Sequence, residues 1–174
     1  MGRPDEDLRL RVARAADDVP LAALDARAWS PQSGFPTVTQ AARRARTFFT
    51  ADSPPHVHLI CEIGGQLVGY VRVRPATPLP ENGHVFGVLG LAVAPEARRR
   101  GVASKLLAAA GEFARTRGAR KLSLRVLGTN DAAMRLYEKL GFEREGVLRG
   151  EFLIDGQYVD DILMTRYLNN APRD

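Results

Sequence analysis

The chain has 174 residues, the size of one domain that can bury its own hydrophobic core. Apolar residues make up 45% and charged residues 26%, which is ordinary for a globular protein and excludes disordered, collagen-like and coiled-coil classes. Lysine and arginine number 25 against 20 aspartates and glutamates, so the basic surface favours anionic ligands without requiring nucleic acid.

Cysteine and histidine usage argues against a disulfide-linked protein and against a metal-binding one. Cys61 is the single cysteine and cannot form an internal disulfide, and the three histidines stand apart from any second ligand type, so we expect no metal site. A reducing cytoplasm suits such a chain. The first residues are polar and acidic, and no apolar run approaches the length of a bilayer, so we expect neither export nor membrane insertion.

The first elements in chain order are a strand and two helices. Residues 8–14 alternate apolar and basic side chains, as a half-buried strand does. A helix follows to about Trp29, with Asp17 and Asp18 as candidate N-caps and Leu21, Leu24 and Ala28 on one face. Residues 30–36 predict a loop, after which Thr39 could cap a basic helix.

Three strands follow. Residues 57–63 and 66–73 are rich in β-branched residues and are joined through two glycines, which predicts a hairpin. Residues 85–94 are almost entirely apolar, which is typical of a central strand covered on both faces. Gly87 and Gly90 weaken that strand, and they indicate either a bulge that splays it from its neighbour or close packing against a helix.

The second half of the chain predicts two helices and three strands. From Arg98 the apolar period is helical up to a stop at Gly118, and a strand at 121–127 follows. A helix at 130–140 ends at Gly141, and two strands, from Phe142 and over 158–168, form a hairpin. This order predicts an α/β (α+β) fold in a single domain over 1–174, with a core at about 8–168, a mixed sheet and helices on both faces.

The stretch 91–104 predicts an anion site. A buried strand leads into a basic turn that opens directly into a helix, where unpaired backbone N–H groups and the helix dipole favour negative charge. Small residues at Gly101 and Ala103 let a phosphate approach the backbone. The glycine and lysine pattern of nucleotide hydrolases and the glycine triplet of dinucleotide folds are both absent, so a pyrophosphate of another kind is expected.

Two motifs in this chain resemble one known family. Arg98-x-x-Gly101-x-Ala103 is similar to the acyl-CoA pyrophosphate motif of the GCN5-related N-acetyltransferases, and the segment from Asn130 through Tyr137 to Phe142 is similar to that family's next motif. The resemblance covers about 8–168 and implies a mainly antiparallel sheet, splayed between its fourth and fifth strands, and acetyl-CoA as co-substrate. The implied cofactor residues are Leu91, Ala92, Val93, Arg98, Arg99, Arg100, Gly101, Val102, Ala103, Ser104, Asn130, Ala133 and Tyr137.

The resemblance also implies catalytic roles. Backbone N–H groups near Leu91 would polarise the thioester, and Tyr137 would protonate the leaving thiolate. The family often has a glutamate on the central strand, but residues 85–93 hold no carboxylate. We take His84 as the candidate base because its ordinary pKa is near 6.5. The other candidates are Glu81, Glu151, Asp160 and Asp161.

The acceptor is expected to be a primary amine of a small molecule or a peptide N-terminus. Residues 136–164 look most like the branch of the family that acts on protein N-termini, ribosomal proteins and polyamines. Trp29 and Phe35 would form a pocket wall or lid, and one of Asp160 and Asp161 would face the cleft and attract an ammonium group. No membrane or nucleic-acid partner is expected, and the chain could form a homodimer.

Structural alternatives exist for each motif. The three arginines at 98–100 could be a solvated charge run, Asn130 could simply cap its helix, and Tyr137 could be core. His84 could be an ordinary surface histidine. A non-catalytic acyl-CoA sensor would keep the phosphate turn without the proton chemistry, whereas a nucleic-acid-binding module would need aromatic residues interleaved with its charges, which this sequence lacks.

Overall fold

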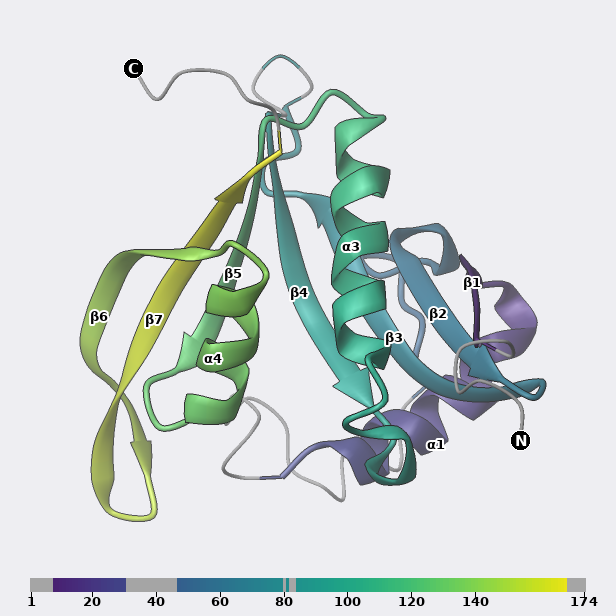
Figure 1. The fold of residues 1–174 in the computed structure, drawn as a ribbon, viewed down its shortest axis with the longest axis horizontal. Helices are drawn as coiled ribbons and strands as arrows, with labels where there is room; N and C mark the ends of the chain where they lie inside the picture. The colour runs from purple at the N-terminus through teal and green to yellow at the C-terminus, as the bar shows by residue number, and fades with distance from the viewer. Residues whose placement is uncertain (1–7, 31–46, 80, 82–83, 169–174) are drawn as a thin grey trace. The chain divides into compact units, whose positions relative to one another are not determined.

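The computed structural model describes residues 8–30, 47–79, 81 and 84–168. Within them a sheet of seven strands has the order β1-β2-β3-β4-β5-β7-β6 (Figure 1). The pair β4–β5 is parallel, and the pairs β1–β2, β2–β3, β5–β7 and β6–β7 are antiparallel. The predicted fold class is therefore confirmed. The strands are β1 (Leu8–Val12), β2 (His58–Ile63), β3 (Gln66–Pro75), β4 (Val85–Val93), β5 (Lys121–Leu127), β6 (Glu143–Ile154) and β7 (Gln157–Tyr167).

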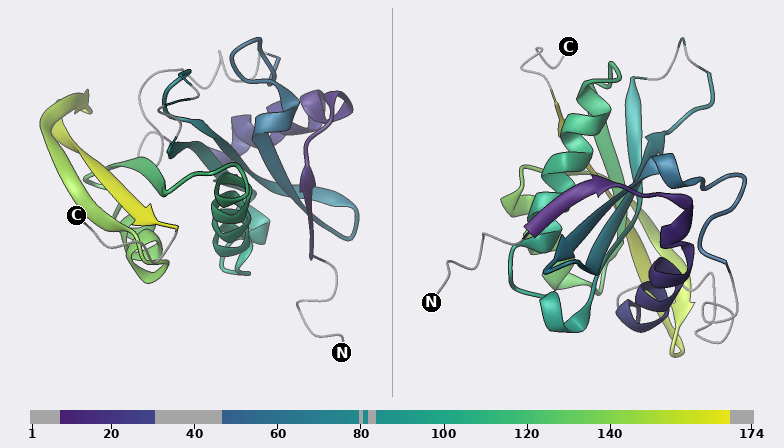
Figure 2. Two further views of the ribbon diagram at one scale, coloured as in Figure 1. Left: turned by 90° about the horizontal axis from the view of Figure 1, so that it is seen from above. Right: turned by 90° about the vertical axis from the view of Figure 1, so that its right-hand side faces the viewer.

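Contacts divide the described chain into two compact units. The first contains residues 8–30, 47–73 and 90–110, and the second contains the described residues of 74–89 together with 111–168. The first unit therefore holds β1, β2, most of β3, the end of β4, the helix α1 (Asp18–Ala28) and most of the helix α3 (Val102–Arg115). The second holds the start of β4, β5, the helix α4 (Asp131–Lys139) and the β6–β7 hairpin, which Figure 2 shows from two further directions.

Two successive residues of β3 show that helices cover both faces of the sheet in the first unit. Gly69 lies against α3, since a Cβ there would be 3.0 Å from Val102 and 3.1 Å from Leu106. Tyr70 hydrogen-bonds to Asp25 of α1. Successive side chains of a strand point to opposite faces, so α3 and α1 pack on opposite sides of β3, as predicted.

Helix α1 buries the predicted face but is not capped as predicted. Leu21, Leu24 and Ala28 are buried, which confirms the apolar stripe. The Asp17 carboxylate makes no cap of α1. It accepts two hydrogen bonds of 2.8 Å from Arg11 and one of 2.7 Å from the Arg14 N–H, and the Arg11 guanidinium holds the pKa of Asp17 below its usual value. A nearby guanidinium is a stronger partner for a carboxylate than a neutral N–H.

Helix α3 begins at Val102, four residues later than the apolar period suggests. Residues 95–97 form a short 3-10 turn, and Arg99 and Gly101 have φ values of 60° and 77°, which no α-helix tolerates. The predicted stop is confirmed at Gly118, whose φ is 82°. The left-handed residues thus make a turn between the 3-10 segment and the start of α3.

The glycines of β4 do not pack against a helix. Gly87 is paired regularly with Ser123 of β5, and a Cβ there would meet only Leu89 of its own strand. A Cβ on Gly90 would lie 3.5 Å from the ring of Tyr70. Pairing between β4 and β5 extends from Val85 to Val88, while β4 itself continues to Val93, in agreement with the predicted splay.

The remaining strand predictions agree closely with the structure. The β2–β3 hairpin turns through Gly64 and Gly65, and the β6–β7 hairpin turns at Asp155 and Gly156, all four with positive φ. The predicted basic helix capped by Thr39 and the loop residue Phe35 lie outside the described residues. Of the helices that the structure describes, none has the combination of length and apolar composition that crossing a bilayer requires.

Candidate active site

The turn before α3 presents backbone N–H groups to an open surface. The first backbone hydrogen bond of the helix joins Lys105 N to Gly101 O at 3.0 Å, so the N–H groups just before Lys105 have no acceptor within the helix. Arg99 and Gly101 have positive φ and Arg98 is extended, so the chain makes a tight turn directly before the helix. A Cβ on Gly101 would meet nothing within 4 Å, so an anion can reach the backbone there.

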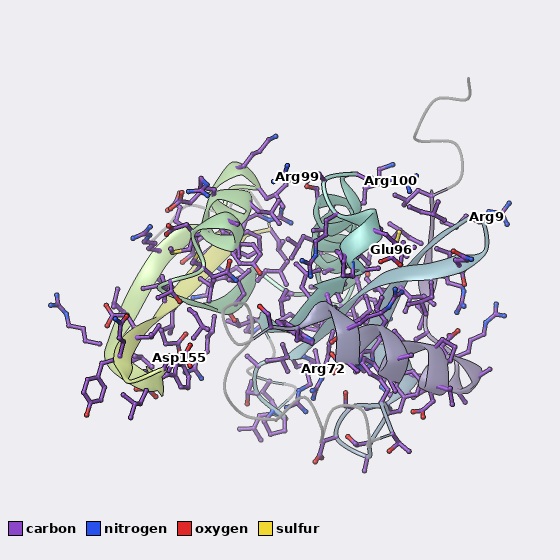
Figure 3. The ribbon with its side chains drawn as sticks, turned by 90° about the horizontal axis from the view of Figure 1, so that it is seen from below. Arg9, Arg72, Glu96, Arg99, Arg100 and Asp155 are labelled. Atoms are coloured by element: carbon purple, nitrogen blue, oxygen red, sulfur yellow. The ribbon has the colours of Figure 1, made fainter. Side chains whose placement is uncertain are left out.

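The three arginines of this turn have different surroundings. The Arg98 guanidinium donates a hydrogen bond of 2.8 Å to the carbonyl of Ala28, the last residue of α1. Arg99 and Arg100 are exposed, and Figure 3 shows both beside the start of α3, near Glu96. Arg98 therefore supports the turn with its side chain, while Arg99 and Arg100 supply positive charge at its surface.

The start of α4 is closed by its own side chain. Asn130 Oδ1 accepts a hydrogen bond of 3.2 Å from Ala133 N, which is the N-cap contact that the sequence allowed. The Asn130 amide nitrogen is not used in this cap. Ala133 is half-buried, and its N–H is satisfied by the cap.

Tyr137 lies seven residues further along α4 and is half-buried. Its ring packs at 5.9 Å from that of Phe142. Burial raises the pKa of the Tyr137 hydroxyl to about 12, since the protein interior disfavours the phenolate. Among the described residues this hydroxyl has no hydrogen-bond partner. Tyr137 is thus a protonated donor at every pH at which the protein would work.

His84 lies at the opposite end of β5 from Asn130. Its carbonyl accepts hydrogen bonds of 2.8 and 3.2 Å from the N–H groups of Arg120 and Lys121, so it sits beside the start of that strand, and its side chain is exposed. Asn130 follows the end of β5, whose seven residues extend over roughly 20 Å. The two predicted residues are therefore not brought together along the strand.

Both candidate aspartates of β7 already have partners. Asp160 Oδ1 accepts a hydrogen bond of 2.8 Å from the backbone N–H of Gly150. Asp161 is fully buried and ion-paired with Arg125 of β5. Its second oxygen, Oδ1, has no partner among the described residues. The burial of Asp161 does not fit the prediction that one of the two carboxylates faces the cleft, and for Asp160, which is half-buried, it stays a prediction.

The sequence prediction missed a buried carboxylate on α1. Asp25 is 1% exposed, and its Oδ1 accepts hydrogen bonds of 2.5 Å from Tyr70 Oη and 2.6 Å from Trp29 Nε1. The four-residue spacing of Asp25 in α1 and Trp29 directly after it is visible in the sequence. The third member comes from β3, so the cluster required the tertiary structure to be recognised. Trp29 is therefore tied to a carboxylate and half-buried, which is compatible with the predicted pocket wall.

Comparison with known proteins shows the family. Residues 21–142 match the acetyltransferase (GNAT) family. An acetyltransferase from Sodalis glossinidius is 33% identical over 105 residues, which cover 59% of this chain and 70% of that protein. A mycothiol acetyltransferase from Rhodococcus jostii is 32% identical over 145 residues, which cover 80% of this chain and 47% of that longer protein.

Solved structures show the same fold. The ribosomal-protein-alanine N-acetyltransferase from Brucella melitensis is 28% identical with a TM-score of 0.68, covering 91% of this chain and 99% of that one. The protein yncA from Salmonella typhimurium, solved with its cofactor acetyl-CoA, is 20% identical with a TM-score of 0.74, covering 97% and 98%. The chain belongs to the acetyltransferase (GNAT) family, as its two motifs predicted.

Proposed function

We propose that the chain is an N-acetyltransferase that moves the acetyl group of acetyl-CoA to a primary amine. The observation that carries this proposal is the turn before α3, where open backbone N–H groups and the exposed Arg99 and Arg100 suit a pyrophosphate. Family membership supports the reaction, and acetyl-CoA in the yncA structure supports the cofactor.

The residues of the turn fit a pyrophosphate. The open space at Gly101 admits the phosphates, and the backbone from Arg98 to Ser104, including Val102 and Ala103, would bind them. We further assign Leu91, Ala92 and Val93 of β4, together with Asn130 and Ala133 of the α4 turn, to the rest of the cofactor. When bound, acetyl-CoA supplies an acetyl group activated as a thioester.

Two groups of the chain would handle the charge that develops. The backbone N–H near Leu91 would donate to the thioester oxygen as it becomes negative, because fixed donors need no reorganisation during the reaction. Tyr137 would give its proton to the departing thiolate and is protonated at neutral pH, since its pKa is raised to about 12. This high pKa makes Tyr137 a weaker acid than an ordinary tyrosine, so hydrogen bonding to the thiolate is the larger part of its contribution.

The acceptor is assigned by its chemical class. We assign a primary amine on a small molecule or a peptide N-terminus, and the likeness to the ribosomal-protein-alanine N-acetyltransferase supports the peptide. Trp29 is kept as an acceptor-side residue. We assign no catalytic step to His84, because it lies beside the start of β5. We assign none to Asp160 and Asp161, because both carboxylates already have hydrogen-bond or ion-pair partners.

A thiol-release assay tests this function. Purified protein with acetyl-CoA is offered a panel of primary amines that includes L-alaninamide, an alanine-initiated peptide and spermidine, and free CoA is measured against a control without amine. Amine-dependent release supports the enzyme. Binding of acetyl-CoA by calorimetry without release for any amine would instead favour an acyl-CoA sensor, a function that the absence of a carboxylate from β4 also allows.

A further inference from the structure

The second unit contains a cavity of about 660 Å³ beside the start of β4. Its described lining residues all lie within 74–89 or after residue 110, so the cavity belongs to that unit alone. Its volume is in the range of sites that take small molecules. We propose that this cavity binds a small aromatic carboxylate, at a site separate from the one assigned to acetyl-CoA.

The cavity lies at the end of α3 that is not used by the proposed phosphate site. The phosphate turn precedes α3, whereas Arg117, which lines the cavity, follows the last residue of that helix. Figure 1 shows the end of α3 and the start of β4 near the top of the view, both within the second unit. None of the described lining residues is among those assigned to acetyl-CoA. The site is therefore independent of the proposed acetyl transfer.

The Arg117 guanidinium is held by the end of its own helix. Its Cζ lies 3.5 Å from the centroid of the Phe113 ring, and its Nη1 donates to the Phe113 carbonyl at 3.0 Å and to Thr116 Oγ1 at 3.5 Å. Among the residues that the structure describes, Nε and Nη2 of Arg117 have no acceptor. Nε and Nη2 form one edge of the guanidinium, and such an edge can donate two parallel hydrogen bonds to a carboxylate.

The other polar groups of the wall also suit an anion. Arg74, at the end of β3, is the second arginine that lines the cavity. Thr77 Oγ1 accepts a hydrogen bond of 3.3 Å from Leu79 N, so the hydroxyl proton of Thr77 can be donated to a ligand. The described lining residues include no acid, and Glu81, the acid nearest to this connection in sequence, is exposed and is not one of them. The polar part of the wall therefore favours negative charge.

The rest of the wall is apolar. Phe86 of β4 is buried, whereas Leu79 is 54% exposed and Pro78 is exposed beside it. The connection that carries Pro78 and Leu79 is fixed at its start, where Ala76 N donates to Val85 O at 2.9 Å. Covering the exposed leucine with an apolar group is favourable, and an aromatic ring supplies a large apolar surface with few rotatable bonds. A ring that carries a carboxylate therefore matches both parts of the wall.

Two-dimensional NMR of the full chain with phenylacetate as the probe tests the site. We expect the amide shifts of Ala76, Thr77 and Leu79 to change and to saturate with phenylacetate. Phenylacetamide lacks the charge and acetate lacks the ring, so each should bind about tenfold more weakly or worse. Absence of shifts at these amides would overturn the site, and so would equal binding of phenylacetamide or of acetate.

A pair of arginine variants tests the anion contact. Arg117→Gln should raise the Kd of phenylacetate by about tenfold to a hundredfold, the scale of lost charge-assisted hydrogen bonds. Arg115→Gln is the matched control, because Arg115 is two residues earlier, is exposed, pairs with Glu112 at 2.6 Å and does not line the cavity. The same spectra check that each variant folds. Equal effects of the two substitutions would overturn the proposal, since the overall positive charge alone would then account for binding.

Acetyl-CoA distinguishes this site from the proposed cofactor site. We expect an excess of acetyl-CoA to leave the Kd of phenylacetate unchanged. Displacement of phenylacetate by acetyl-CoA would overturn the separate site and leave the proposed function standing. Conversely, if no amine releases CoA but phenylacetate binds in an Arg117-dependent way, the proposed transfer fails and the carboxylate site stands.

Discussion

The turns that begin α3 and α4 carry the two family motifs, yet they treat their free N–H groups in opposite ways. Before α3 the left-handed Arg99 and Gly101 leave the donors facing open space. Before α4 the side chain of Asn130 accepts from Ala133 and closes the end. Free N–H groups at a helix start need water or a ligand as acceptor, so the turn before α3 is the one of the two at which we propose that an anion binds.

A second comparison concerns one ionisable ring in each unit. His58 in the first unit is held neutral by burial with a lowered pKa, and Tyr137 in the second is held neutral by burial with a raised one. Burial disfavours the charged form of both rings. His58 therefore stays neutral when the pH falls, whereas Tyr137 stays neutral when the pH rises. Four experiments can break or sharpen these comparisons.

The largest effect is expected at the open turn. Gly101→Asp places a negative charge and a strained left-handed side chain against the proposed phosphates, so acetyl-CoA affinity should fall about a thousandfold, the scale of two or more lost charge-assisted hydrogen bonds. Calorimetry measures it. Gly118→Asp is the control, because Gly118 has a similar φ of 82° and equally open space at the other end of the helix. Equal losses in both variants would remove the phosphate role of the α3 turn.

His58 should make the protein sensitive to acid. Its pKa falls from 6.5 when unfolded to about 4 when folded, so the unfolded state takes up a proton first as the pH drops. The contribution is complete above pH 6.5 and is lost between pH 6.5 and 4, at a cost of about 3 kcal/mol. Urea unfolding across this range measures the slope, and His58→Phe should flatten it. An unchanged slope in that variant would assign the acid sensitivity to other groups.

Tyr137→Phe should lower kcat by about tenfold to a hundredfold while acetyl-CoA affinity stays nearly the same, because the ring still packs on Phe142. With a pKa of about 12, the tyrosine should give no basic limb in kcat below pH 11. Steady-state kinetics with the best amine of the panel measure both features. Full activity in Tyr137→Phe at every pH would make this residue part of the core only.

The smallest effect is expected at the closed turn. Asn130→Ala removes the N-cap of α4 and should cost about 1 kcal/mol of unfolding free energy. Asn130→Asp keeps the accepting oxygen and the cap but removes the amide N–H donors. A loss of acetyl-CoA affinity in both variants, with stability lost only in Asn130→Ala, would show that the amide contacts the cofactor. Unchanged affinity in both would leave Asn130 as a cap alone.

Local patterns predicted most of the fold. The β2–β3 and β6–β7 hairpins, the stops at Gly118 and Gly141 and the strand at 121–127 all follow from short-range turn chemistry and periodicity. The start of α3 was predicted four residues too early, because the positive φ angles of Arg99 and Gly101 cannot be inferred from an apolar period that begins at Val102. Periodicity reports which residues face the core, whereas left-handed backbone depends on what the turn must bind or avoid.

The sequence by itself determined the family, the order of the elements and the basic turn, because motif spacing and alternation are local properties of the chain. Only the tertiary structure decided the partners and the burial of the carboxylates. Asp160 and Asp161 look alike in the sequence, yet the structure binds one to a backbone N–H and buries the other against Arg125. Asp25 resembled an ordinary helical residue until β3 brought Tyr70 to it. The charge and accessibility of an acid depend on the partners and burial that distant segments impose, and those are set when the sheet assembles.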